Sequence, residues 1–463
     1  MPRTDADRTA ALRTLPSVDK LLREEAFAEF AKPALTRVVK QLVDELRAGA
    51  LDGSLGKEEL RRRCEPEALV RAVTTRCAAA QRRRHERVYN ATGIVLHTGI
   101  GRAPLAPEAV DAVAQAAGYA VVEVDPATGK RDQRELAVAA LLVELTGAGG
   151  ALIVNNNAAA TTLMLAALTA ETEVVVSRGE LVEIGGGFRV PDVMKRAGCH
   201  MVEVGATNKT HVRDFRRATR EQTSAYLKVH PSNFRIEGFA STPSVRELRD
   251  LADANEAEVL VLDDLGSGFL TDAPLAGLHE EPRVSGSLGQ GAHVTCFSGD
   301  KLLGGPQCGI LVGDRELIAR CRAHPLYRAL RCDKLTHAAL EATLLLYRDT
   351  DPLQTVPTLR MLSASADALR ARAESLAAML QEHGATVVAS DSFAGSGANP
   401  AKPLASFATA IAGGDVECDR LRAARPISVF ARVKEGRVLL DARTLLTEDL
   451  EAFARAVRGA LDA

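Results

Sequence analysis

The chain has 463 residues, of which 46% are hydrophobic, 25% charged and 4% aromatic, and it contains no tryptophan. These proportions are those of a globular protein with an aliphatic core, and a chain of this length is expected to form more than one domain. They exclude a disordered chain, and no apolar run approaches the ~20 residues that a membrane-spanning helix needs.

The net charge of −2 is unevenly distributed along the chain. Residues 1–90 hold 19 Lys and Arg against 14 Asp and Glu, whereas the remainder holds 39 against 46. A basic N-terminal part indicates a polyanionic partner, although a solvated helical face explains the same charges. The eight cysteines form no CxxC pair. We therefore predict no metal site, no disulfide framework and a reducing, cytoplasmic location, because the first residues also lack the apolar segment of a signal peptide.

Residues 1–85 are predicted to form an N-terminal helical domain. Helical spacing places one set of apolar residues on a single face, namely Leu35, Val38, Val39, Leu42 and Leu46. A second, charged helix is expected from about Lys57, and the basic run Gln81-RRRHER closes this part.

Residues 86–348 are predicted to form a large α/β domain. Short apolar runs alternate here with Ala- and Leu-rich helical segments, and the strand candidates are Ala151-LIV, Glu173-VVVS, His200-MVEV, Ala225-YLKVH, Glu258-VLVLDD, His293-VTCFS and Cys308-GILVG. Continuous apolar runs are typical of strands buried on both faces of a parallel sheet. The ligand site of such a sheet lies beyond the carboxyl ends of its strands.

Residues 349–463 are predicted to form a small C-terminal α/β domain. A long helix is expected from Thr358 to His383, and a last helix from Thr447. The strand candidates of this domain are Thr386-VVAS, Ser406-FATAI and Arg437-VLLD.

Three strand ends carry residues suited to chemistry. Lys301 follows the run His293-VTCFS and precedes a Gly-rich turn, and Asp263 and Asp264 end the run Val259-LVLDD. The third strand, Ala151-LIV, leads into Asn155-NNAAATTL, where capping residues precede a helix. The free N–H groups and the dipole of a helix N-terminus form an anion site.

A lysine, a carboxylate and a phosphate cradle at neighbouring strand ends are what pyridoxal phosphate requires. The lysine forms the Schiff base, the aspartate pairs with the ring nitrogen, and the helix N-terminus binds the phosphate. Each feature also has a structural explanation: a loop lysine, a pair of capping or metal-binding aspartates, and an ordinary Asn-rich helix start. Their ordered combination favours the cofactor.

Longer motifs resemble the bacterial selenocysteine synthases, the L-seryl-tRNA(Sec) selenium transferases, from about residue 12 to the C-terminus. The matching motifs are Leu12-RTLPSVDKLL, Tyr89-NATGIVLHTGIGRAPL, Ser177-RGELVEIGGGFRVPDVM, Val204-GATNKTH, Val229-HPSNFRIEGF, Asp264-LGSG, Phe297-SGDKLLGGPQCGILVG and His324-PLYRALRCDK. The stretch Ser392-FAGSGANPAKPLAS departs from the family pattern, and nothing is inferred from it.

The resemblance implies a fold-type-I pyridoxal-phosphate enzyme with active sites at a dimer interface and a ring of dimers, a decamer in the family. It implies conversion of seryl-tRNA(Sec) and selenophosphate to selenocysteinyl-tRNA(Sec) and phosphate, by β-elimination to dehydroalanyl-tRNA and addition of selenium. The basic, helical residues 1–85 are expected to bind the tRNA. Neither a membrane nor DNA is an expected partner.

The resemblance also distributes roles among the site residues. Lys301 is expected to bind the cofactor and act as general base, with Asp300 in proton transfer or in orienting groups near the leaving hydroxyl, or as a simple cap. Asp264 is preferred over Asp263 for the ring nitrogen. The remaining expectations are phosphate contacts from Asn157 and Ser298 and selenophosphate contacts from Arg102, Arg328 and Arg331. His230 and Asn233 are expected either to contact the ring or substrate or to have structural roles.

Two other functions remain open from the sequence. A pyridoxal-phosphate lyase acting on a small amino acid or amino sugar would not need the basic residues 12–85. A tRNA-binding α/β protein without cofactor would not need Lys301.

Overall fold

The computed structural model describes residues 14–81, 84–185, 187–232, 234, 236, 238–275, 277–395, 397, 402–446 and 449–462. The chain divides into two compact units, Met1–Arg87 and Val88–Ala463, which are described separately below. No helix in these ranges is long and apolar enough to cross a membrane. All eight cysteines are among the described residues, and each is a free thiol.

The first unit is helical. Its elements are α2 (Val18–Leu21), η1 (Glu25–Phe27), α3 (Lys32–Asp52), α4 (Lys57–Arg63) and α5 (Pro66–Gln81). All five apolar residues that the periodicity placed on one face of α3 are buried, and they share a core with Leu60 of α4 and Val73 and Cys77 of α5. Arg82 and Arg83, in the basic run that ends this part, lie outside the described residues.

The second unit is built on a seven-stranded sheet in the order β3-β11-β10-β9-β8-β4-β7. The strands are β3 (Gly150–Val154), β4 (Glu173–Ser177), β7 (His200–Val204), β8 (Thr223–Val229), β9 (Leu260–Gly266), β10 (Val294–Ser298) and β11 (Gly309–Gly313). Only β11 runs antiparallel to its neighbours among these described strands. All seven strand predictions are confirmed, as is the mostly parallel α/β fold.

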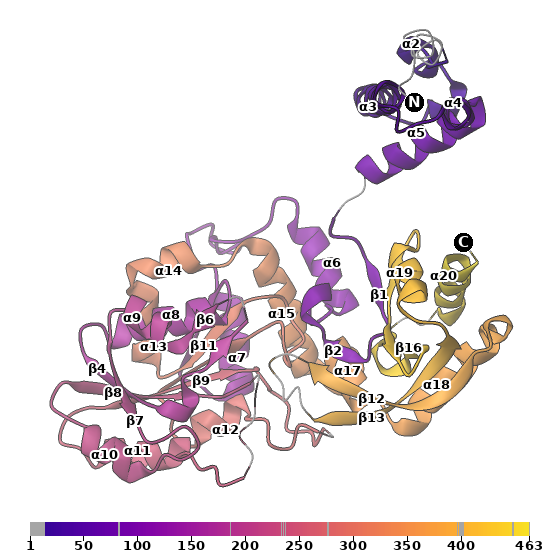
Figure 1. The fold of residues 1–463 in the computed structure, drawn as a ribbon. Helices are drawn as coiled ribbons and strands as arrows, with labels where there is room; N and C mark the ends of the chain where they lie inside the picture. Colours follow the sequence, from indigo (N-terminus) through magenta and orange to yellow (C-terminus); the bar gives the residue numbers. More distant parts are fainter. Residues whose placement is uncertain are drawn as a thin grey trace. The chain divides into compact units, whose positions relative to one another are not determined.

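Helices cover both faces of this sheet (Figure 1). One face packs against α8 (Asn157–Leu168), α9 (Val190–Arg196), α13 (Arg315–Ala323) and α14 (Pro325–Leu330). The other packs against α7 (Leu136–Thr146), α10 (Val212–Ala218), α11 (Val245–Asp253), α12 (Val284–Gly289) and α15 (Lys334–Asp349). Because both faces are covered, β3, β4, β10 and β11 are nearly continuous apolar runs, whereas the edge strand β7 is partly exposed.

The C-terminal part forms a second sheet in the order β15-β16-β13-β12-β2. It contains β12 (Thr386–Gly395), β13 (Pro403–Ala412), β15 (Arg432–Lys434), β16 (Arg437–Asp441) and β2 (Ile94–Leu96). In addition, β1 (Val88–Asn90) pairs with β14 (Ser428–Phe430). Residues 88–96 are expected from the sequence to belong to the large domain, but their strands pair with those of the C-terminal part.

Helices α18 (Ala366–Met379), α19 (Asp415–Ala423) and α20 (Leu450–Leu461) cover this sheet. The expected long helix from Thr358 to His383 was wrong, because it is divided into α17 (Pro357–Ser363), α18 and η4 (Gln381–His383). The break lies at Ala364 and Ser365, where the Ser365 side chain caps α18 by accepting a hydrogen bond from Ala368 N.

Short elements complete the second unit. They are η2 (Thr98–Ile100), α6 (Pro107–Ala116), η3 (Arg178–Glu180), β5 (Glu183–Ile184), β6 (Phe188–Arg189), α16 (Pro352–Thr355) and η5 (Ala442–Thr444).

Candidate active site

Lys301 lies just beyond the carboxyl end of β10. Three backbone hydrogen bonds fix this turn, from Gly304 N to Lys301 O at 3.0 Å, from Gly305 N to Gly299 O at 2.9 Å and from Leu302 N to Ser267 O at 3.1 Å. Lys301 is only 5% exposed. Burial lowers the pKa of its amine, and Asp264 opposes that shift. A buried amine with a lowered pKa is more often neutral, which is the form that attacks an aldehyde.

Asp264 lies on β9, the strand next to β10. Asn157 Nδ2 donates to its Oδ1 at 2.7 Å and Thr161 Oγ1 donates to its Oδ2 at 2.8 Å. Burial raises the pKa of Asp264, while these hydrogen bonds and the charge of Lys301 oppose the shift. The structure therefore brings Asp264, Asn157 and Lys301 together.

The neighbouring Asp263 points to the opposite face of the sheet, since successive side chains of a strand alternate. Ser287 Oγ of α12 donates to Asp263 Oδ2 at 2.5 Å. Burial raises the pKa of Asp263 to about 6. The two adjacent aspartates therefore lie in different environments on opposite faces of the sheet, and only Asp264 faces the start of α8.

The N-terminus of α8 follows β3 directly. Asn156 caps the helix by accepting a hydrogen bond from Ala159 N at 2.9 Å. Asn157 Oδ1 is buried and accepts no hydrogen bond among the described residues. A buried acceptor without a donor is costly, so this oxygen is suited to a ligand that brings a donor.

Arg102 reaches the site from the loop after β2. Its guanidinium lies 2.7 Å from Asp300 Oδ2, next to Lys301 in the chain. Arg102 has a φ of 60°, a left-handed conformation that costs about 1–3 kcal/mol in a non-glycine residue. Hydrogen bonds from Arg102 N to His97 O and from Ala103 N to Asp300 O hold the loop in place.

The other predicted residues have more varied surroundings. Ser298 is the buried last residue of β10. Arg331 Nη1 lies 3.5 Å from Glu123 Oε1, and Arg328 is exposed on α14. The segment that carries Arg328 and Arg331 is linked to the residues just before α8, because Asn155 N donates a hydrogen bond to Leu330 O at 2.8 Å.

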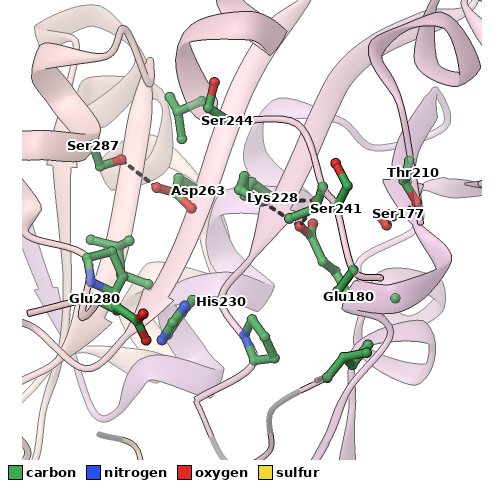
Figure 2. Close-up of a pocket in the computed structure, with 18 of the residues that line it drawn as sticks. Ser177, Glu180, Thr210, Lys228, His230, Ser241, Ser244, Asp263, Glu280 and Ser287 are labelled. Carbon is green, nitrogen blue, oxygen red and sulfur yellow. Dashed lines mark hydrogen bonds and ion pairs between the residues drawn. The ribbon is translucent and has the colours of Figure 1, made fainter. Parts of the chain in front are cut away.

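His230 follows β8, and its backbone N–H donates to Asp264 O at 2.9 Å. Its side chain borders a cavity of about 510 Å³ (Figure 2). Asn233 lies outside the described residues. No cluster of three potential metal ligands occurs within the described ranges.

The cavity lies at the carboxyl ends of β4, β8 and β9 and contains polar residues that the sequence analysis missed. Lys228 Nζ donates to Glu180 Oε1 at 2.5 Å, and Thr242 Oγ1 donates to the same oxygen at 2.8 Å. Figure 2 shows the Lys228–Glu180 pair beside Asp263 and its partner Ser287. A lysine within an apolar strand was the sequence signal that could have indicated this pair.

The comparisons with known proteins identify one family. Residues 88–446 match the family model described as L-seryl-tRNA selenium transferase. Curated proteins named L-seryl-tRNA(Sec) selenium transferase are 44% identical in Moorella thermoacetica, over 97% of each chain, and 44% identical in Geobacter metallireducens, over 97% of this chain and 99% of the relative.

One solved structure, D-glucosaminate-6-phosphate ammonia-lyase, is 21% identical over 81% of this chain and 96% of its own, with a TM-score of 0.56. At this identity the likeness supports the fold alone. The family match spans the strands that position Lys301 and Asp264 and the loop that positions Arg102. With the family model and nearly full-length relatives in agreement, this chain belongs to the L-seryl-tRNA selenium transferase family.

Proposed function

We propose that this protein converts seryl-tRNA(Sec) to selenocysteinyl-tRNA(Sec) with selenophosphate as the selenium donor, using pyridoxal phosphate. The observation that supports this most strongly is the buried Lys301 amine, with the Asp264–Asn157 pair at the adjacent strand end and the Arg102–Asp300 pair beside it. Family membership over nearly the whole chain supports seryl-tRNA as the substrate.

The residues present fit pyridoxal phosphate. The Lys301 amine is placed to bind the aldehyde, and the buried Asp264 carboxylate is placed to keep the ring nitrogen protonated. The N-terminus of α8 supplies free N–H groups for the phosphate. When bound, the cofactor supplies an aldehyde that captures amines and a ring that stores electrons from the substrate's Cα–H bond.

The chain's own residues account for proton transfer. Lys301, when its amine is free, is positioned to take the proton from Cα of the seryl group. Loss of that proton and of the serine hydroxyl, which departs as water, gives dehydroalanyl-tRNA. Asp300, whose side chain is 10% exposed and paired with Arg102, is suited to orient groups and relay a proton near the departing hydroxyl.

Arg102 is the best-placed ligand for the selenium donor. A guanidinium forms two parallel hydrogen bonds with an oxyanion such as the phosphoryl group of selenophosphate. Selenium adds to Cβ of the dehydroalanyl group, a proton returns to Cα, and water takes up the phosphoryl group as phosphate. Arg328 and Arg331 are proposed to contribute to the same anion site. In this proposal the site is completed at the interface of a dimer.

Residues 1–85 are proposed to bind the tRNA. They form a separate helical unit with its own core and an excess of positive charge. Binding through phosphates weakens steeply with salt, because each neutralised phosphate releases counterions. A homo-oligomer built from dimers is part of the same proposal.

The direct test is incubation of the purified protein with seryl-tRNA(Sec) and selenophosphate, followed by identification of the esterified amino acid. We expect selenocysteine with selenophosphate present and dehydroalanine without it. Seryl-tRNA(Ser) serves as the control substrate and should remain unchanged. A serine ester that persists in the presence of cofactor-loaded protein would refute the proposal.

A further inference from the structure

The cavity beside His230 has the size and position of a second binding site. Its volume of about 510 Å³ falls within the ~300–1,000 Å³ typical of ligand pockets. It opens at the carboxyl ends of β4, β8 and β9, the edge of the sheet where Lys301 also lies. The cofactor residues Lys301, Asp264 and Asn157 are not among the residues that line it.

Ser232 and Glu281 connect the cavity with Lys301. A Cβ on Gly266 would lie 3.6 Å from both Lys301 Nζ and Ser232 Oγ, so this serine comes close to the lysine. Ser232 follows the cavity residues His230 and Pro231. Burial lowers the pKa of Lys301, and Glu281 of the cavity wall is among the carboxylates that oppose this shift. The two sites are therefore neighbours.

The cavity walls combine apolar surface with carboxylates, of which Glu281 has a buried oxygen that accepts no hydrogen bond among the described residues. The apolar side chains are Pro231, Phe234, Ile236, Val245, Leu265 and Pro282. The side chain of Glu281 is 2% exposed, and its buried oxygen is Oε1. That oxygen lies 3.5 Å from His230 Nε2. A ligand with a flat apolar face and an N–H donor would satisfy it.

Two other carboxylates of the cavity wall already have partners. Glu180 pairs with Lys228 and accepts from Thr242, and Asp263 accepts from Ser287. The basic side chains of Lys209 and Arg283 also line the cavity; Arg283 Nη1 lies 3.5 Å from the exposed Asp272 Oδ1, and Lys209 Nζ lies over the Phe239 ring. The cavity therefore offers a hydrogen-bond acceptor inside and positive charges that suit phosphates.

We propose that this cavity binds the 3′-terminal adenosine of the aminoacylated tRNA, with the base between the apolar walls and its 6-amino group donating to Glu281. This inference rests on the proposed function, because the seryl group is esterified to the ribose of that adenosine. A base held beside Ser232 brings the ester to Lys301, and Lys209 and Arg283 face the phosphates of the preceding nucleotides.

Binding of free adenosine to the full-length, cofactor-loaded protein tests the inference by saturation-transfer NMR, which does not depend on turnover. A nucleoside filling such a pocket should bind with a Kd of about 0.1 mM. Purine riboside, which lacks the 6-amino group, should bind about tenfold more weakly, as expected for a lost hydrogen bond to a charged group. Glu281→Gln should reduce this preference severalfold.

Two glycines of α12 provide matched variants. Gly286 lines the cavity, and a Cβ there meets only Arg283 Cβ at 3.7 Å, whereas a Cβ on Gly289 meets nothing within 4 Å. Gly286→Leu should weaken adenosine binding at least tenfold and raise the KM for seryl-tRNA. Gly289→Leu should change neither value, and both variants should retain the absorbance of bound cofactor.

Three results would overturn the inference: no adenosine binding at millimolar concentration, equal affinity for purine riboside, or wild-type adenosine binding by a folded Gly286→Leu variant. The comparison of the two nucleosides needs no variant, so it decides the matter even if Gly286→Leu fails to fold. Selenocysteine formation by a protein that does not bind adenosine would refute this inference alone. Adenosine binding without selenocysteine formation would instead refute the proposed function.

Discussion

Replacing Arg102 with alanine should impair use of the selenium donor far more than elimination of the serine hydroxyl. Arg102 lies 2.7 Å from Asp300 Oδ2, so the variant loses both a guanidinium for the donor and the partner of a buried carboxylate. Lys301, Asp264 and Asn157 keep their own contacts, since none of their hydrogen bonds involves Arg102.

The expected magnitude follows from the kind of interaction that is lost. A hydrogen bond to a charged group contributes roughly 1.5–3 kcal/mol, and every 1.4 kcal/mol is about a factor of ten. Selenophosphate use should therefore fall about tenfold to a hundredfold. Arg102 also lowers the pKa of Lys301, after the larger effect of burial, so the pKa of Lys301 should rise in the variant.

The two half-reactions can be assayed separately. Dehydroalanyl-tRNA formation is measured without selenophosphate, and selenium addition is measured on preformed dehydroalanyl-tRNA over a range of donor concentrations. The pKa of Lys301 is followed by the pH dependence of the rate at which apoprotein takes up pyridoxal phosphate. Its profile should move to higher pH in Arg102→Ala and to lower pH in Asp300→Asn, because Asp300 raises the pKa of Lys301.

Equal loss of both half-reactions in Arg102→Ala would contradict this reasoning, because it would assign Arg102 to tRNA binding or to folding of the site. Arg102→Lys separates charge from shape. Lysine keeps the positive charge but cannot form the two parallel hydrogen bonds of a guanidinium, so it should restore the pH profile and only part of the donor affinity.

Three further changes test other parts of the structure. Asp264→Asn should retain the cofactor but lose most turnover, because a neutral amide does not keep the ring nitrogen protonated; full turnover would exclude Asp264 from this role. Gly397→Ala should slow cofactor uptake, since its Cβ would lie 2.6 Å from Lys301 Nζ. Gly384→Ala, at φ +64° with nothing within 4 Å, is the control for backbone strain, and equal slowing in both variants would contradict the contact. Deleting residues 1–85 should leave a yellow protein with weakened, less salt-dependent tRNA binding; unchanged affinity in a titration would show that these residues are not the tRNA-binding unit.

Most strands of the large sheet could be predicted because they are buried on both faces and therefore mainly apolar; the edge strand β7, with His200 and Glu203 exposed, is the exception. Asp264 lies at the end of one of these runs and Lys301 shortly after another. Because ligands bind at the carboxyl ends of parallel strands, the two residues could be predicted to share a site. The choice between Asp263 and Asp264 depended on family resemblance. The structure adds the physical distinction, since only Asp264 faces Asn157 and Thr161.

Long-range pairings could not be predicted in this way. Strands β1 and β2 have three residues each and pair with β14 and β12, which lie hundreds of residues later in the chain. Nothing in a three-residue run specifies such a distant partner. The approach of Gly397 to Lys301 has the same origin, because it depends on how the C-terminal part folds against the large sheet.

The break between α17 and α18 could have been predicted from the sequence. Ser365 is a favourable N-cap residue, but the apolar pattern on both sides concealed it. The cavity residues Glu180 and Lys228 were harder to find. They meet only through the pairing of β4 with β8. Lys228 stands out within an apolar strand, but nothing in the sequence identifies Glu180 of η3 as its partner.

Borohydride reduction of the cofactor-loaded protein, followed by peptide mass analysis, tests the central claim most directly. Borohydride fixes pyridoxal phosphate to the amine that binds it, and we predict the added mass on the peptide that contains Lys301. The Lys301→Ala variant should fold, remain colourless after dialysis and carry no added mass. Cofactor fixed to another lysine in the wild-type protein, or retained by Lys301→Ala, would contradict the assignment of this site.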